Sequence, residues 1–288
     1  MKNGLVIIHY NDPESVINLI NNVKNYGVLD RIVIVDNKSR LDALEKVKQL
    51  ESSKVKIIEN NENKGFSYAI NIGSKYLINE FGECNLIISN ADIEISSEDD
   101  LKKLISYLEK NDIGVVAPTV IENGVLNRGW KMPSPVTDAL MNIVYIHNKI
   151  RKKKVFYNDD YYKDEFSYVD VVSGCFFLIK SNTLKEIEYF DEDVFLYYEE
   201  NILAKKVSNI NKKIIVCNNI KIKHNHSVSI DKNLKKLKKL KIQKKSQYYF
   251  QTKYNNANIL EKVLLKVTVF VNRYILALIY WIKDLRKK

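Results

Sequence analysis

Short apolar runs alternate with helical patterns between residues 5 and 109, and this alternation limits the possible folds more than any other feature. Four runs have the length and branched apolar character of buried strands. They are Leu5–Ile8, Arg31–Val35, Val55–Glu59 and Asn85–Ser89. Apolar residues recur at helical spacing between and after the runs, so the chain predicts βαβ units. We therefore expect an α/β fold with a mostly parallel central sheet and flanking helices.

Polar clusters follow each of the expected strands. In parallel sheets the carboxyl ends of the strands meet at one edge, where ligands bind. The clusters are Tyr10-Asn11, Asp36-Asn37, Asn63-Lys64-Gly65 and Asn90-Ala91-Asp92. The sequence therefore predicts that these side chains converge at one edge of the sheet.

Two of these clusters contain a carboxylate directly after an apolar strand. Asp92 is a candidate ligand for Mg²⁺ or Mn²⁺, because hard cations bind carboxylates together with substrate phosphates. Asn-Ala-Asp also makes a plain turn, so the triplet alone is weak. Asp36 and Asn37 suit hydrogen bonds to a ribose or a base, although Asp36 is equally typical of a helix cap.

The third cluster, Asn63-Lys64-Gly65, comes just before a helical pattern that begins near Phe66. The free N–H groups of a helix N-terminus and the charge of Lys64 suit a pyrophosphate. Gly65 as a simple turn glycine is the alternative interpretation.

The ordered series of motifs resembles family 2 glycosyltransferases of the Rossmann-like GT-A fold, over residues 4–258. The resemblance is closest to bacterial rhamnosyl- and galactofuranosyl-type transferases of surface polysaccharide synthesis, such as capsule. The matching segments are Val35–Ser39, Asn63–Phe66 with Asn71-Ile72-Gly73, Asn90–Asp92, Ser173–Ile179, Phe190–Glu192, Phe195–Glu200, His224–Ser229 and Tyr248–Asn255.

This resemblance implies roles for particular residues. Asp36 would recognise the nucleoside, Asp92 would bind the metal on the diphosphate, and the Glu199-Glu200 pair would supply the base, with Glu200 favoured by position. The other predicted donor-binding residues are Tyr10, Asn11, Asn37, Asn63, Lys64, Gly65, Asn71 and Asn90. The chain departs from the family pattern at Ala91, at Glu200 and at Ile202, where proline, aspartate and an acid are usual. The alternative for the acid pair is a solvated helix N-terminus, where carboxylates are common.

Two of the four histidines, His224 and His226, occur late in the chain at i and i+2. In a strand they would point to the same side. One of them is expected to complete the metal site or to contact the diphosphate, and a surface histidine is the alternative.

Positive charge is concentrated towards the C-terminus. The net charge is +11, and ten lysines with one acid lie between Lys221 and Lys245. Lys232–Lys245 and Ile259–Ile282 both combine basic and apolar residues at helical spacing. We expect a GT-A domain over 1–230, with a nucleotide-sugar half (1–118) and an acceptor half (119–230), and a basic amphipathic helical extension over 231–288. The extension predicts contact with an anionic membrane surface, with a solvated helix packed on the domain as the alternative.

The sequence thus predicts a metal-dependent, inverting hexosyl- or deoxyhexosyltransferase. It would take a UDP- or dTDP-sugar and extend a lipid-linked glycan on the inner face of the cell membrane. Three separated cysteines without a CxxC pair agree with a reducing cytoplasm. Loops within residues 119–168 are expected to choose the acceptor, and an oligomer is possible.

A nucleotidyltransferase ranks low because no glycine-rich basic loop follows the first strand. A basic nucleic-acid- or membrane-binding protein with an inactive transferase-like domain is the other alternative, although no nucleic-acid recognition motif accompanies the lysines.

Overall fold

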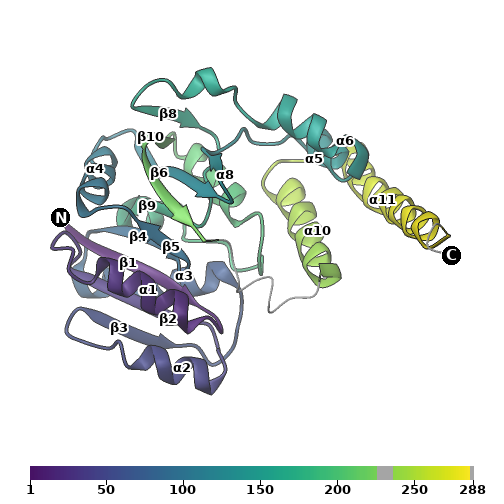
Figure 1. Ribbon diagram of the computed structural model, residues 1–288. Coiled ribbons are helices and arrows are strands. Elements are labelled where there is room, and N and C mark those ends of the chain that lie inside the picture. Colours follow the sequence, from purple (N-terminus) through teal and green to yellow (C-terminus); the bar gives the residue numbers. More distant parts are fainter. Residues whose placement is uncertain (226–235, 286–288) are drawn as a thin grey trace.

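The computed structural model describes residues 1–225 and 236–285, and a central ten-stranded sheet organises them (Figure 1). The strand order is β3-β2-β1-β4-β9-β6-β10-β5, with β7 paired to β6 and β8 paired to β10. The strands are β1 (Lys2–His9), β2 (Arg31–Asp36), β3 (Val55–Glu59), β4 (Cys84–Asn90), β5 (Ile93–Ile95), β6 (Ile113–Glu122), β7 (Val125–Asn127), β8 (Phe166–Val169), β9 (Phe176–Lys180) and β10 (Lys213–His224).

The strand directions confirm the α/β prediction and add an antiparallel part. Strands β3, β2, β1 and β4 pair in parallel, as the alternating pattern predicts. Strand β9 is antiparallel to both β4 and β6, and β10 is parallel to β6. Strands β6 and β10 therefore run in the same direction as β4, and all of these strands end at one edge. We call it the carboxyl edge; His9, Asp36, Asn90, Glu122 and His224 are the last residues of their strands there.

Helices cover both faces of the sheet. They are α1 (Pro13–Val23), α2 (Leu41–Lys48), α3 (Phe66–Phe81), α4 (Glu98–Leu108), α5 (Pro135–Met141), α6 (Val144–Ile150), α7 (Ser181–Glu186), α8 (Glu199–Asn209), α10 (Lys236–Lys253) and α11 (Ile259–Leu285). A π-helical turn, η1 (Arg151–Val155), and a 3-10 turn, η2 (Asp159–Tyr162), lie between α6 and β8.

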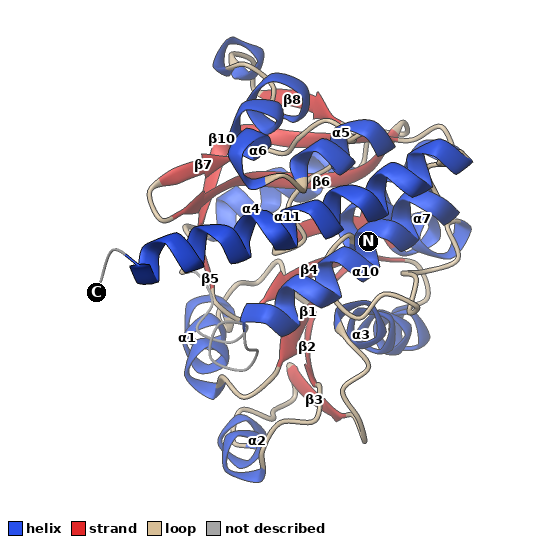
Figure 2. Cartoon of the chain, turned by 90° about the vertical axis from the view of Figure 1, so that its right-hand side faces the viewer, coloured by secondary structure: helices blue, strands red, loops and turns tan. Residues whose placement is uncertain are grey.

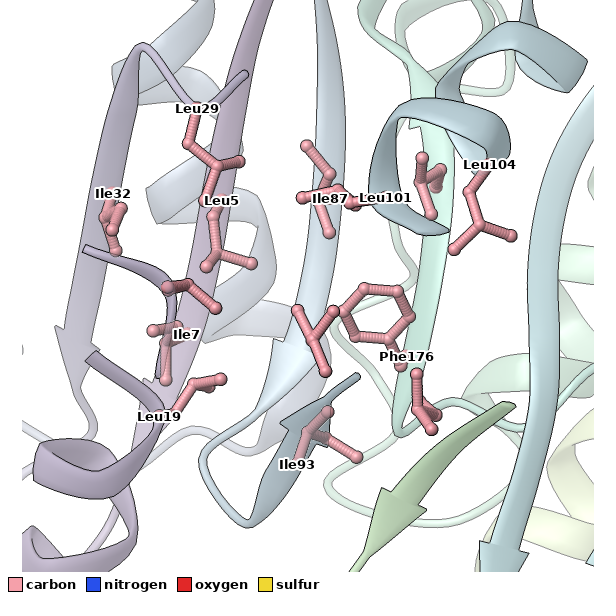
Figure 3. Packing of buried hydrophobic residues seen from close by; sticks show 14 of the residues in the cluster. Leu5, Ile7, Leu19, Leu29, Ile32, Ile87, Ile93, Leu101, Leu104 and Phe176 are labelled. Atoms are coloured by element: carbon pink, nitrogen blue, oxygen red, sulfur yellow. The ribbon is translucent and has the colours of Figure 1, made fainter. Parts of the chain in front are cut away.

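Alternation along the strands builds two core layers, because successive strand side chains point to opposite faces. Leu5 and Ile7 of β1 pack with residues of α1 and α4 on one face, shown in Figure 3. Val6 packs with α3, α7 and α8 on the other. On that second face α3 lies close to the sheet: a β-carbon on Gly73 would stand 2.5 Å from a methyl of Val6. The glycine therefore permits the close helix–sheet contact.

The C-terminal helices α10 and α11 lie on the side towards which the parallel strands run (Figure 1). Figure 2, which looks from that side, shows both helices in front of the strands. Helix α11 runs along α5, where Asn142 donates a hydrogen bond to Thr268 (3.1 Å). The predicted helical extension is thus present, but the boundary predicted at residue 230 lies outside the described residues.

The described part of α10 does not pack on the domain through Leu237. The Leu237 side chain is 82% exposed, whereas Ser246, Gln247, Phe250 and Gln251 are buried. Helix α10 therefore docks through polar groups and one phenylalanine. None of the helices within the described ranges has the length and apolar character needed to span a membrane.

Candidate active site

The carboxyl edge brings Asp92 and His224 together. Strand β5 pairs antiparallel with β10, and Ile93 lies opposite His224 in that register. The preceding residue, Asp92, therefore reaches the imidazole, with its Oδ1 3.1 Å from His224 Nε2. Both side chains are less than a tenth exposed. The predicted proximity of Asp92 and His224 is thus present in the structure, while His226 lies outside the described residues.

A second carboxylate faces the same imidazole. Glu122, the last residue of β6, has its Oε1 2.7 Å from His224 Nδ1. Burial alone lowers the pKa of His224, but hydrogen bonds to Asp92, Cys175 and Glu122 outweigh it and raise the pKa to about 12. The two carboxylates therefore stabilise the protonated imidazole, and a divalent cation that binds through His224 must displace that proton.

The ligand chemistry around His224 fits a divalent cation. Ligand atoms of Glu122, Cys175 and His224 all lie within 4.8 Å of one another, and Asp92 adjoins them. Carboxylates suit Mg²⁺ and Mn²⁺, and an imidazole shifts the preference towards transition metals. Sequence reasoning missed Glu122 and Cys175. Glu122 carries the same signal as Asp92, an acid at a strand end, whereas nothing in the sequence marks Cys175.

Cys175 reaches this edge because β9 runs antiparallel and begins there. The carbonyl of Cys175 accepts a hydrogen bond from the Asn90 N–H (2.8 Å). Ser89 lies opposite Phe176 in the β4–β9 register. Asn90, predicted to bind the donor, is therefore the last residue of β4 and lies beside the start of β9.

Asp36 is held by groups of the protein itself. Its side chain is buried, with Oδ1 2.8 Å from Nδ1 of His9 and Oδ2 accepting from the Ser39 N–H at 3.0 Å. Burial raises the pKa of the Asp36 carboxyl, but the hydrogen bonds from His9 and Ser39 outweigh it and lower the pKa. His9 had no role assigned from the sequence. Asp36 thus remains an ionised acceptor at the end of β2.

The loop before α3 is a preorganised polar network. Asn37 donates to Asn63 Oδ1 and to the Gly65 carbonyl, both at 3.0 Å. Gly65 has φ +102°, and a β-carbon there would lie 2.2 Å from the carbonyl oxygen of Phe195. Only glycine fits this backbone conformation and this contact. The structure therefore joins the predicted Asn37, Asn63 and Gly65 in one network against the segment before the acid pair.

Of the remaining residues predicted to bind the donor, Tyr10, Asn11 and Lys64 lie in loops that follow strands, whereas Asn71 lies within α3. Tyr10 and Asn11 follow β1 at the carboxyl edge, where Asn11 accepts a hydrogen bond from the Arg40 N–H (2.8 Å). Lys64 is half-exposed and forms an ion pair with Glu62 (2.8 Å). Asn71 instead belongs to another contact: its buried amide exchanges hydrogen bonds with the backbone of Phe190 at 2.9 and 3.0 Å. In this structure Asn71 anchors the 190–192 turn to α3.

The acid pair begins α8 and lies near the cluster of Glu122, Cys175 and His224. Tyr197 and Tyr198 both have positive φ values, 70° and 68°, and turn the chain sharply into Glu199. Such left-handed residues cost about 1–3 kcal/mol each and cluster at functional sites. A β-carbon on Gly174 would lie 4.0 Å from Cβ of Glu200, so Glu200 lies against the residue that precedes Cys175.

Burial distinguishes the two acids. Desolvation raises the pKa of both carboxyls, and the charge of Glu200 raises that of Glu199 further. Glu199 is buried, and its Oε2 has no hydrogen-bond partner among the described residues. Glu200 is only partly buried. Glu200 is therefore the more exposed of the two acids.

A buried carboxylate fixes the turn that leads into α8. The Tyr198 hydroxyl donates to Asp138 of α5, 2.7 Å from its Oδ1, and Gln251 of α10 donates to Oδ2 at 2.7 Å. Burial raises the pKa of Asp138 despite these hydrogen bonds. Asp138 therefore ties the acid pair to the C-terminal helices.

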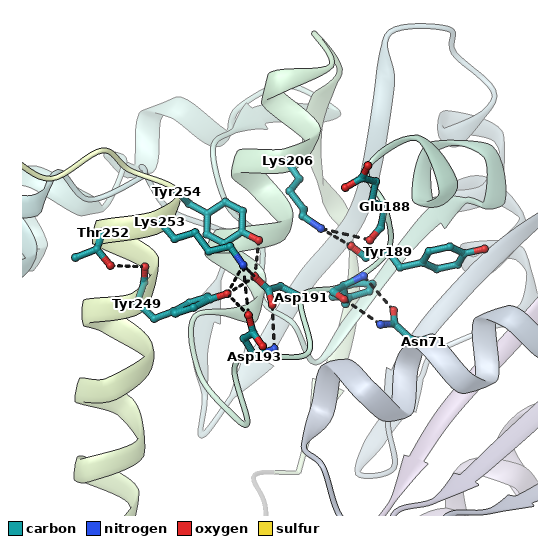
Figure 4. A network of polar contacts seen from close by, with 11 residues as sticks. Asn71, Glu188, Tyr189, Asp191, Asp193, Lys206, Tyr249, Thr252, Lys253 and Tyr254 are labelled. Carbon is teal, nitrogen blue, oxygen red and sulfur yellow. Dashed lines mark hydrogen bonds and ion pairs between the residues drawn. The ribbon is translucent and has the colours of Figure 1, made fainter.

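A second polar cluster docks α10 on the 190–193 turn (Figure 4). The Tyr249 hydroxyl donates to Asp191 Oδ2 at 2.8 Å and to Asp193 Oδ2 at 2.7 Å. Lys253 forms an ion pair with Asp191 at 3.1 Å. Asp191, Asp193 and Tyr198 all precede the acid pair, so the extension holds the segment of the chain that leads into α8.

Comparison with known proteins agrees with this geometry. A family model described as glycosyl transferase family 2 matches residues 5–187. The chain is 23% identical over 225 residues to the low-salt glycan biosynthesis hexosyltransferase Agl10 of Haloferax volcanii, covering 78% of this chain and 67% of the relative. It is 26% identical over 239 residues to an uncharacterized glycosyltransferase of Haemophilus influenzae, covering 72% of each.

Solved structures share the fold. GalNAc-T7 with UDP, GalNAc and Mn²⁺ superposes with a TM-score of 0.60 at 16% identity, over 80% of this chain and 44% of that one. The mannosyltransferase PcManGT from Pyrobaculum calidifontis, in complex with GDP-Man and Mn²⁺, gives 0.57 at 12% identity, over 93% and 69%. Staphylococcus aureus TarS gives 0.55 at 15% identity, over 95% and 44%. The chain spans less than half the length of GalNAc-T7 and TarS. These likenesses establish the GT-A fold.

Proposed function

The chain belongs to glycosyl transferase family 2, and we propose that it is a metal-dependent, inverting hexosyl- or deoxyhexosyltransferase that extends a glycan. The observation that carries this proposal is the meeting of two groups at the carboxyl edge. Asp92, Glu122 and His224 form a cation-binding cluster, and Glu200 lies against the residue that precedes Cys175. One group suits the diphosphate of a donor and the other suits an acceptor hydroxyl.

Different residues of the chain have different roles in the proposed reaction. Glu200 takes the proton from the acceptor hydroxyl as its oxygen bonds to the anomeric carbon of the donor sugar. The bond from that carbon to the nucleoside diphosphate breaks on the opposite side, so a single displacement inverts the configuration. Asp92 and His224, with Glu122, would hold a divalent cation, which neutralises charge on the leaving diphosphate. Lys64 and the N-terminus of α3 add positive potential on the same side.

The donor is a nucleotide-diphosphate sugar, with UDP or dTDP as the nucleotide. GalNAc-T7 was crystallised with UDP and PcManGT with GDP-Man, both with Mn²⁺, which supports this class of donor without choosing the base. Asp36 and Asn37, fixed at the end of β2, are the residues proposed to contact the nucleoside.

The acceptor is proposed to be a lipid-linked glycan of a surface polysaccharide, reached on the inner face of the cell membrane. A groove of about 370 Å³ lies between α10 and α11 and combines Lys244, Lys245 and Lys266 with apolar residues. Along α11, exposed apolar side chains occur at helical spacing; they are Ile259, Leu260, Val263, Val267, Phe270, Val271 and Tyr274. Apolar residues beside lysines favour an anionic lipid surface.

A donor panel tests the proposal. UDP-, dTDP- and GDP-sugars are incubated with the protein and Mn²⁺, and thermal shift and sugar release are measured. At least one donor should raise the melting temperature only with metal and be hydrolysed slowly without an acceptor. Binding of none of the donors would indicate an inactive transferase-like protein. DNA binding that is stronger than liposome binding would instead favour the nucleic-acid alternative.

A further inference from the structure

A cavity of about 540 Å³ lies between the second half of α8 and the tyrosine-rich segment before β8. Tyr157, Tyr161 and Tyr168 line one side, and Lys205 and Ser208 of α8 line the other. The volume falls within the range of about 300–1,000 Å³ typical of small-molecule sites. Neither the metal-binding cluster nor the acid pair lines this cavity, so it is a separate place on the molecule.

The tyrosines form a fixed aromatic platform. Tyr157 and Tyr161 stack with ring centroids 4.4 Å apart and planes 16° apart. The Tyr161 hydroxyl donates to the Tyr168 carbonyl (2.6 Å) and ties η2 to β8. Even so, Tyr161 is 43% and Tyr168 44% exposed. Part of the ring surface of Tyr161 and Tyr168 therefore remains open to solvent, while Lys213 Nζ lies over the Tyr168 ring, 5.0 Å from its centroid.

Polar groups surround the platform. The Asp170 carboxylate lines the cavity and is oriented by the Met132 N–H (2.8 Å) and the Tyr157 hydroxyl (3.3 Å). Across from it, the side chains of Lys205 and Ser208 have no hydrogen-bond or ion-pair partner within 1–225 and 236–285. The cavity thus offers one fixed acceptor and two donors that the protein does not use.

The cavity continues the face of α8 on which Glu200 lies. Glu200, Ala204 and Ser208 are spaced by four residues and share one side of the helix. At a rise of about 1.5 Å per residue, Ser208 lies about 12 Å along the axis from Glu200. Met132 links the two places, because it lines the cavity and its Sδ accepts a hydrogen bond from Asn201 (3.6 Å). A molecule that reaches from Glu200 to the cavity must be longer than one sugar.

We propose that this cavity is a subsite for a distal sugar of the acceptor glycan, an inference that rests on the proposed function. A sugar ring has an apolar C–H face and a rim of hydroxyls. The aromatic platform matches the face, and Asp170, Lys205 and Ser208 match the rim. A nucleotide could also stack on the tyrosines, with Lys205, Lys212 and Lys213 near its phosphates, and its binding here is the competing outcome of the test. The enzyme therefore binds oligosaccharide acceptors more tightly than the matching monosaccharides.

Binding of defined neutral oligosaccharides tests the subsite. Gluco-, galacto- and N-acetylglucosamine oligosaccharides and their monosaccharides are titrated into the full chain and followed by saturation-transfer NMR. At least one oligosaccharide should bind more tightly than its monosaccharide. Tyr161→Ala should weaken it about tenfold, since the lost stacking corresponds to about 1.4 kcal/mol. Tyr161→Phe keeps the ring and should bind like the wild type.

The variant Ser208→Trp and the rate of donor hydrolysis distinguish failure of the subsite from failure of the proposed function. Ser208→Trp fills the cavity from a solvent-exposed helix position and should also abolish oligosaccharide binding. Donor hydrolysis without an acceptor should be unchanged in all three variants. If no oligosaccharide binds, if Tyr161→Ala binds as well as wild type, or if a nucleotide binds here instead, the subsite is refuted while donor hydrolysis still supports the proposed function. Absence of donor hydrolysis by the wild-type protein would refute the proposed function itself.

Discussion

The Nε2 atom of His224 lies 3.1 Å from Oδ1 of Asp92, although the two residues come from opposite halves of the chain. The short strand β5 makes this possible, because Ile93 pairs with His224. The contact joins the nucleotide-sugar half of the predicted domain to the strand that ends its acceptor half. Removal of either side chain should therefore disturb one common site.

Asp92→Ala should lose Mn²⁺ binding. Loss of even an outer-shell partner costs about 10–100-fold in metal affinity, and loss of a ligand should cost at least as much. Isothermal titration with Mn²⁺ measures the change directly. Asp99→Ala, at an exposed carboxylate in α4, is the matched control and should bind metal normally. Unchanged metal and donor binding by Asp92→Ala would remove the central assignment.

Glu122→Gln should weaken Mn²⁺ binding about tenfold or more, because Glu122 contacts His224 at 2.7 Å and adds negative charge. The amide keeps the size of the side chain, so the fold should be retained. Glu94→Gln, at a half-exposed acid of neighbouring β5, serves as the control. A Glu122→Gln protein with wild-type metal affinity would show that Asp92 and His224 suffice.

Glu200→Gln should keep donor binding and lose transfer by about 10²–10⁴-fold, the usual contribution of a general base. Burial raises the pKa of Glu200, so the carboxylate needed for proton removal forms only above the ordinary glutamate range. The transfer rate of the wild type should consequently rise with pH through the raised pKa, and Glu200→Gln should lack that rise. If Glu199→Gln loses transfer instead, the roles of the two acids are exchanged.

Asp138→Ala should destabilise the protein by about 2–4 kcal/mol, because it leaves the Tyr198 hydroxyl and the Gln251 amide without their buried acceptor. Urea denaturation measures the free energy of unfolding. Asp138→Asn retains one acceptor oxygen and should lose less of the free energy of unfolding.

Since burial raises the pKa of Asp138, the folded state binds its proton more tightly than the unfolded state. Stability of the wild type should therefore fall as pH rises from the ordinary aspartate pKa to the raised one, and Asp138→Asn should show less of this fall.

Val263→Glu with Phe270→Glu should reduce binding to anionic vesicles, because both side chains are exposed apolar residues of α11. Co-sedimentation with phosphatidylglycerol vesicles at low and physiological salt measures the effect. Leu41→Glu makes the same change at an exposed residue of α2, on the opposite side of the molecule in Figure 1. Equal vesicle binding by the α11 double variant and the wild type would remove the membrane proposal.

The sequence by itself determined the parallel half of the fold and most of its edge. Short apolar runs and helical spacing are local patterns, so strands β1 to β4 could be placed from residues 5–90, and with them Asp36, Asn63 and Asp92. The carboxyl ends of parallel strands must meet, and this rule alone is enough to predict that those polar clusters lie together.

Only the tertiary structure decided which distant residues complete the site. Glu122, Cys175 and His224 meet Asp92 because β9 inserts antiparallel between β4 and β6 and because β5 pairs with β10. Strand order depends on long-range pairing, which local periodicity does not encode. The same holds for Asn71, whose amide binds the 190–192 turn, and for Asp138, whose carboxylate joins α5, α8 and α10. Their roles follow from which backbone groups lie nearby after folding, and a linear motif cannot specify that.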